Sequence, residues 1–135
     1  NYNGSLQSVY DVLKFRVRAN TSTPASTTTY VVTVASGTLY GGGSGNVFYI
    51  SGTGNPVLTF ARGSTYIFDQ SNTSNAGHQI AFKDSSGNAY TTGVTTTGTL
   101  GQAGAKTTVV VPSTGAVPAQ YYCTSHGNGM GNIIS

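Results

Sequence analysis

Three residue types that bind soft metal ions lie close together near the end of the chain. The stretch YYCTSHGNGMG (121–131) contains the only cysteine, Cys123, the only methionine, Met130, and one of the two histidines, His126. A thiolate, an imidazole and a thioether at the spacing C-x2-H-x3-M are ligand types that suit copper. Three glycines in this stretch allow the backbone to fold tightly, so that the side chains can converge.

A copper site of this kind needs a second imidazole, and His78 is the only other histidine. His78 begins HQIAFKD (78–84), which reads as a strand, and Cys123 ends AQYYC (119–123), which reads as another. In a β-sandwich the ends of neighbouring strands meet, so His78 is expected beside the loop that follows Cys123. Taken alone, a lone Cys is more often a small buried apolar residue than a ligand.

The rest of the chain reads as all-β, because Thr, Val and Tyr favour strands while Gly and Ser disfavour helices. Turn signals recur about every eight to twelve residues, which is typical of a Greek-key β-sandwich, here of about seven or eight strands. Residues 1–45 are interpreted as an N-terminal arm or extra strands that reach a neighbouring subunit, and 46–135 as the main domain. The expected strands are 12–19, 29–36, 47–52, 55–63, 64–71, 78–84, 106–113 and 119–123, with a long loop over 89–105 and a loop rather than a helix after Cys123.

Charge is sparse, since only 7% of the residues are Asp, Glu, Lys or Arg and Glu is absent. A surface of Thr, Ser, Asn and Gly is more typical of an extracellular or virion protein than of a cytosolic enzyme. No apolar run approaches the ~20 residues of a membrane-spanning helix, so membrane insertion is not expected. With one cysteine no internal disulfide can form.

The net charge of +3 raises the question of nucleic-acid binding. Half of the cations, Lys14, Arg16 and Arg18, alternate along KFRVR and would share one face of a strand. This face is either a solvated, charged strand edge or a docking strip for an acidic partner. No aromatic residue interleaves with the cations on that face, so nucleic acid is not an expected partner.

The stretch AQYYCTSHGNGMG resembles the C-terminal ligand loop of the cupredoxin (blue-copper, plastocyanin-like) family. NAGHQIAFKD resembles the other ligand segment of that family, and GNPVLTFARGSTYIFD the strand and turn before it, so that the resemblance covers about residues 46 to 134. It implies one mononuclear type 1 copper with His78, Cys123 and His126 as strong ligands and Met130 as the weak axial one. A metal-free fold that retains these residues is the alternative.

The residues beside His78 depart from the family pattern. The family often has Pro before this His and Asn after it, where Gly77 and Gln79 stand here. That Asn ties the two ligand loops together and donates toward the cysteine sulfur, so Gln79 is the candidate for this role.

Two functions suit such a site, and neither is enzymatic, because one copper offers little for multi-electron oxygen chemistry. The first is a structural or adhesive subunit of an extracellular or phage virion assembly, which binds neighbouring copies or subunits. Phrases such as RGSTYIFD and YYC-x2-H-x-GMG resemble cupredoxin-like domains of marine phage proteins. The second is a secreted or periplasmic electron carrier with a redox partner. The sparse charge favours the assembly subunit.

Overall fold

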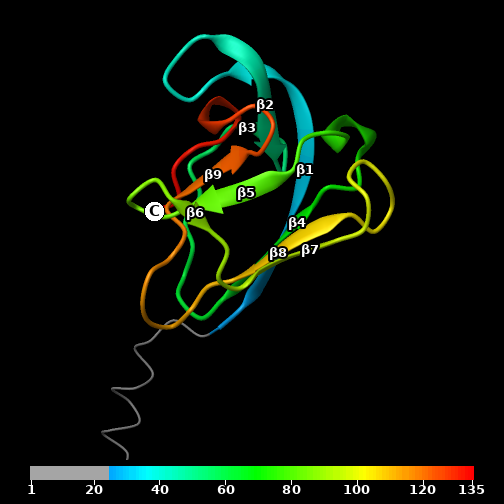
Figure 1. The fold of residues 1–135 in the computed structure, drawn as a ribbon. Helices are drawn as coiled ribbons and strands as arrows, with labels where there is room; N and C mark the ends of the chain where they lie inside the picture. The colour runs from blue at the N-terminus through cyan, green and yellow to red at the C-terminus, as the bar shows by residue number, and fades with distance from the viewer. Residues whose placement is uncertain (1–24) are drawn as a thin grey trace, which may run out of the picture.

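The computed structural model describes residues 25–135, and the strand predicted at 12–19 lies outside the described residues. In the described part the chain forms nine strands and two short 3-10 turns (Figure 1). These are β1 (Thr27–Thr38), β2 (Ser44–Ile50), β3 (Thr53–Gly54), β4 (Thr65–Asp69), η1 (Thr73–Asn75), β5 (Ile80–Lys83), β6 (Ala89–Tyr90), β7 (Val94–Thr97), β8 (Lys106–Val110), β9 (Gln120–Cys123) and η2 (Asn128–Met130). Between residues 25 and 135 no helix is long and apolar enough to cross a membrane.

The strands form two sheets, which confirms the all-β class. One sheet has the order β3-β2-β1-β4-β8-β7, and the other has the order β6-β5-β9. The long strand β1 joins two parts of the larger sheet, because residues 27–31 pair parallel with β4 and residues 32–38 pair antiparallel with β2. Among residues 25–135 there are nine strands rather than seven or eight, because β3 and β6 are two-residue pairings and β7 forms where a loop was expected.

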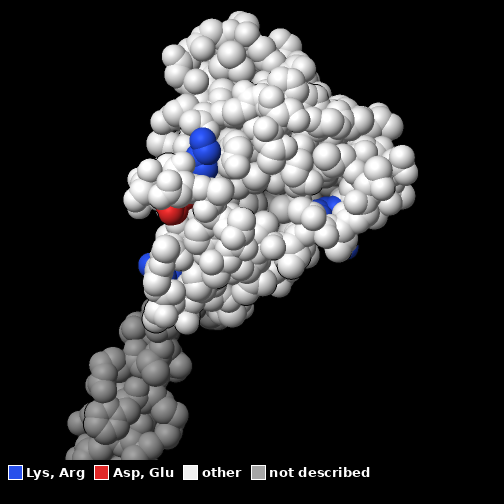
Figure 2. Space-filling model, viewed as in Figure 1, with Lys and Arg blue, Asp and Glu red and all other residues white. Residues whose placement is uncertain are grey.

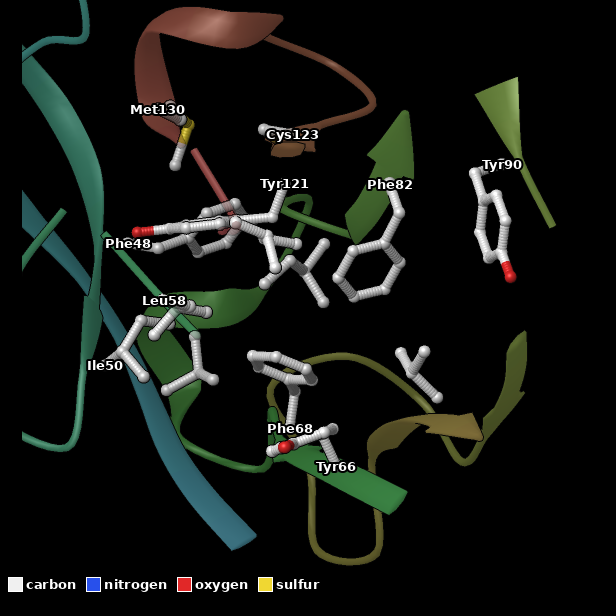
Figure 3. Close-up of a cluster of buried hydrophobic side chains, with 14 of the residues drawn as sticks. Phe48, Ile50, Leu58, Tyr66, Phe68, Phe82, Tyr90, Tyr121, Cys123 and Met130 are labelled. Carbon is white, nitrogen blue, oxygen red and sulfur yellow. The ribbon is translucent and has the colours of Figure 1, made fainter. Parts of the chain in front are cut away.

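Both sheets contribute to one apolar core, as the period-two alternation of the strands requires. In β4, Tyr66 and Phe68 are buried, while the residues between and beside them are partly exposed. Phe68 meets Phe82 of β5 with 5.6 Å between ring centroids (Figure 3). The members of this apolar core cluster that are exposed by at most 1% are Val32, Phe48, Phe68, Ile80, Phe82, Val109, Val111, Tyr121 and Cys123.

The described part of the N-terminal region belongs to the same sandwich as the residues that follow it. Strand β1 lies between β2 and β4, and its Val32 is fully buried in the core. The boundary drawn between residues 45 and 46 falls inside β2, which pairs with β1 along its whole length. From residue 25 onward the chain therefore forms one packed unit.

Two local predictions were wrong. Residues 55–63 form no strand, because their backbone meets the chain end only at an isolated bridge from Leu58 to Ile134 and at the N–H of Phe60, which donates to the carbonyl of Ser135. The stretch 89–105 is not a continuous loop, since its threonine-rich part forms β7 against β8. The tail after Cys123 is a loop, as predicted, and includes the short 3-10 turn η2.

Charged side chains are few and scattered on the described surface (Figure 2). In residues 25–135 the cations are Arg62, Lys83 and Lys106, and the acids are Asp69 and Asp84. Asp69 and Lys106 are Cα partners on neighbouring strands. The described part therefore presents no concentrated charge of either sign.

Candidate metal centre

The structure brings together the cysteine and both histidines. The Sγ atom of Cys123 lies 3.8 Å from Nδ1 of His78 and 3.5 Å from Nδ1 of His126. One ligand atom of each residue lies within 4.8 Å of the others. The two imidazole rings face each other with centroids 4.8 Å apart and a tilt of 32°. Within residues 25–135 this is the one group of three His, Cys, Asp or Glu side chains close enough to share an ion.

The pairing of β5 with β9 produces this convergence. Ile80 and Cys123 are Cα partners in the antiparallel ladder, although they lie 43 residues apart in the sequence. The N–H of Thr124 donates to the carbonyl of Gln79 at 3.1 Å and continues the contact beyond the strand ends. His78 therefore lies next to the chain as it leaves Cys123, in agreement with the predicted juxtaposition.

His126 is placed by a tight loop that closes on itself. The N–H of Gly127 donates to the carbonyl of Cys123 at 2.7 Å, and the N–H of Cys123 donates to the carbonyl of Gly127 at 3.2 Å. Gly127 has a φ of 80°, a conformation that costs glycine little. The loop thus returns the His126 ring to the Cys123 sulfur three residues after it.

Met130 lies at the same end of the core as Cys123. It ends the turn η2, is 2% exposed, and sits above the Tyr121 ring (Figure 3). Met130 and His126 line one pocket of about 270 Å³. This packing depends on Gly131, since a Cβ there would overlap the carbonyl oxygen of Tyr121. Met130 and His126 therefore border the same pocket.

Burial is graded across the three clustered residues. Cys123 is fully buried, His78 is partly exposed and His126 is exposed. Burial, and then the proximity of His126, lower the pKa of His78. A lowered pKa keeps this imidazole neutral near pH 7, which is the form that binds a metal. The group contains no carboxylate.

The distances from the sulfur to the two nitrogens are close to those expected around a shared ion. Bond lengths of about 2.3 Å to sulfur and about 2.0 Å to nitrogen place these two atoms about 3.5–3.7 Å apart at tetrahedral to trigonal angles. The observed separation of 3.5 Å lies within that range, and the separation of 3.8 Å lies just above it. Two imidazoles, a cysteine sulfur and a nearby thioether are donor types that suit copper, whereas methionine is an uncommon ligand for zinc.

The side chain of Gln79 does not donate to the Cys123 sulfur, as the sequence had suggested, but to other groups. Its side-chain Nε2 donates to Thr107 Oγ1 at 2.7 Å, to the carbonyl of Ile80 at 2.8 Å and to Gln70 Oε1 at 3.2 Å. These partners account for its N–H groups. Of the polar groups of Gln79, only the backbone carbonyl connects the two ligand segments, by accepting from the N–H of Thr124.

Sequence reasoning missed Gln70 and Asn75, two fully buried residues that bind the backbone of His78, Gln70 through its side chain and Asn75 through its backbone carbonyl. In a chain so rich in uncharged polar residues, nothing in the sequence distinguishes a buried amide from an exposed one. The predicted docking residues Lys14, Arg16 and Arg18 lie outside the described residues.

Comparison with known proteins yields no match: no family model, curated protein or solved structure resembles the chain closely enough to be assigned. The site geometry therefore carries the functional argument.

Proposed function

We propose that this chain is a cupredoxin-like module with a Greek-key sandwich that binds one copper ion. His78, Cys123 and His126 would be its strong ligands, and Met130 the weak fourth one. The observation that carries the proposal is the placement of both Nδ1 atoms at 3.8 and 3.5 Å from a fully buried cysteine sulfur. Copper held by such ligands supplies reversible one-electron transfer.

The residues of the chain favour electron transfer over a cross-linking role. Ile80 and Cys123 are already joined by the β5–β9 pairing, so a bond from His78 to Cys123 would close only a very short additional loop. Loop closure of that size adds little to folding stability. Meanwhile Cys123 is shielded from water and the His126 ring is exposed, which provides a short path from the site to the surface.

A structural or adhesive subunit of an extracellular or virion assembly is the second candidate. The observation that favours it is a described surface with scattered charges (Figure 2) and several exposed valines. Val31, Val57 and Val110 are 55, 59 and 49% exposed. Such a surface suits contacts with neighbouring subunits of similar composition, because little charge must be desolvated.

Copper titration followed by visible absorption tests the proposed site. We expect an intense thiolate-to-copper band in the wild type, its complete loss in Cys123→Ser, and its retention in Ser125→Ala, an exposed neighbour in the same loop. Met130→Leu should keep the band and change the reduction potential, since the axial ligand tunes it. A wild type that stays colourless, with a thermal midpoint that does not respond to copper, would reject the site.

Voltammetry and sedimentation distinguish the two roles. A copper-loaded monomer with a reversible one-electron wave supports electron transfer. A protein that assembles into large oligomers and whose copper does not cycle supports the assembly subunit.

A further inference from the structure

Two fully buried side-chain amides lie between the larger sheet and the segment that carries His78. Gln70 follows β4 directly, and Asn75 ends the turn η1; both are 0% exposed. Amides are tolerated at such depth only where hydrogen bonds satisfy them. Their bonding partners therefore indicate what they hold in place.

The Gln70 amide binds the backbone on both sides of Gln79. Its Nε2 donates to the carbonyl of His78 at 2.8 Å, and its Oε1 accepts from the N–H of Ile80 at 3.4 Å. The same Oε1 accepts from Thr107 Oγ1 of β8 at 3.1 Å, and Nε2 also donates to Asn75 Oδ1 at 3.1 Å. Gln70 thus connects β4, β8 and the start of β5.

Asn75 completes the contacts to His78. Its backbone carbonyl accepts from the N–H of His78 at 2.8 Å. Its Nδ2 donates to the carbonyl of Val32 in β1 at 2.7 Å and to that of Asn72 at 3.1 Å. The N–H and the carbonyl of His78 are therefore both bound, and the groups that bind them are fixed to the larger sheet.

We propose that Gln70 and Asn75 are positioning residues that set the distance from His78 to Cys123. This inference rests on the proposed metal site. His78 precedes the first ladder residue of β5, Ile80, so strand pairing alone does not fix it. The side-chain amide of Gln70 and the backbone carbonyl of Asn75 bind it instead, and the side chains of both residues bind the larger sheet. They take over the ordering role that the sequence had suggested for Gln79, whose own side chain joins the same cluster through Gln70 and Thr107.

The experiment compares Gln70→Met, which keeps the side-chain size and removes the amide, with Ser64→Ala. Ser64 is also fully buried and lies at the opposite end of β4, away from His78. We expect copper affinity to fall by about 10- to 100-fold in Gln70→Met, the usual effect of removing groups that orient a ligand. The visible band and the reduction potential should change as well. Ser64→Ala should leave all three unchanged.

A readout without metal is the exchange rate of the His78 and Ile80 amide protons in the apo protein. We expect faster exchange in Gln70→Met and not in Ser64→Ala. If Gln70→Met fails to fold, Thr107→Val removes one bond to the Gln70 amide and should give a smaller change in the same direction.

The outcomes separate this inference from the proposed function. Suppose that the wild type binds copper and that the variants bind it with the same affinity, spectrum and reduction potential. This result would overturn the positioning role but would still support the copper site. A wild type that binds no copper would reject the site. In that case unchanged amide exchange overturns the positioning role as well, and selective acceleration at His78 and Ile80 supports it.

Discussion

The two segments that form the candidate site are held in different ways. The tail from Cys123 to Met130 closes through its own backbone, with reciprocal hydrogen bonds between Cys123 and Gly127. The segment around His78 has a local turn of its own, from the N–H of His78 to the carbonyl of Asn75, but it is also bound by a side chain from the end of β4, because Gln70 donates to the carbonyl of His78. The tail is thus shaped mainly by its own backbone, and the His78 segment depends in addition on a buried side chain from the larger sheet.

This difference predicts different sensitivities. The tail depends on close backbone packing, so it should respond most to added volume. The His78 segment depends on buried hydrogen bonds, so it should respond most to the loss of a polar group. Substitutions in each segment can test the contrast.

The largest effect is expected in the tail, from Gly131→Ala. The new Cβ would overlap the carbonyl oxygen of Tyr121, a backbone atom that cannot move aside easily. We expect the free energy of unfolding to fall by about 3 kcal/mol or more, measured by urea denaturation. Gly129→Ala is the matched control, because its Cβ would meet only the Leu39 side chain at 3.5 Å. Equal losses in the two variants would contradict the packing argument.

A smaller effect is expected from Asn72→Ala in the His78 segment. Asn72 caps η1, and its Oδ1 accepts from the Ser74 N–H at 3.0 Å and from Ser74 Oγ at 2.7 Å. Loss of such a cap costs about 0.5–2 kcal/mol of unfolding free energy, measurable as a lower thermal midpoint. Thr73→Ala, an exposed neighbour in the same turn, should change it little. A larger loss in Thr73→Ala would argue against the capping role.

The smallest effect is expected from pH in the metal-free protein. Burial and His126 lower the pKa of His78 below its ordinary value of 6.5. Between the two values the unfolded chain binds more protons, so stability falls as the pH drops through about 6.5 and is regained above it. Urea unfolding at about pH 7.5 and about pH 5 should show this loss. In His78→Gln the loss of unfolding free energy between these two pH values should be smaller. An identical loss in this variant would show that other groups cause the pH dependence.

Much of the fold could be predicted because alternation is a local property. Strands at 29–36, 64–71, 78–84, 106–113 and 119–123 correspond to β1, β4, β5, β8 and β9. The failures occur where pairing overrides composition. Residues 55–63 were predicted as a strand, but Leu58 makes only a single bridge, to Ile134. The threonine-rich residues 94–97 were predicted as loop, but they form β7 because they pair with β8.

Cys123, His126 and Met130 could be recognised from the sequence alone, because rare residue types at close spacing, separated by glycines, need only a short loop to converge. Tertiary structure decided the position of His78, which lies 45 residues from Cys123 in the sequence, and the buried groups that bind its backbone. The physical reason is that the burial of an uncharged polar side chain such as Gln70 is a property of the packed sheets, and its residue type does not encode it.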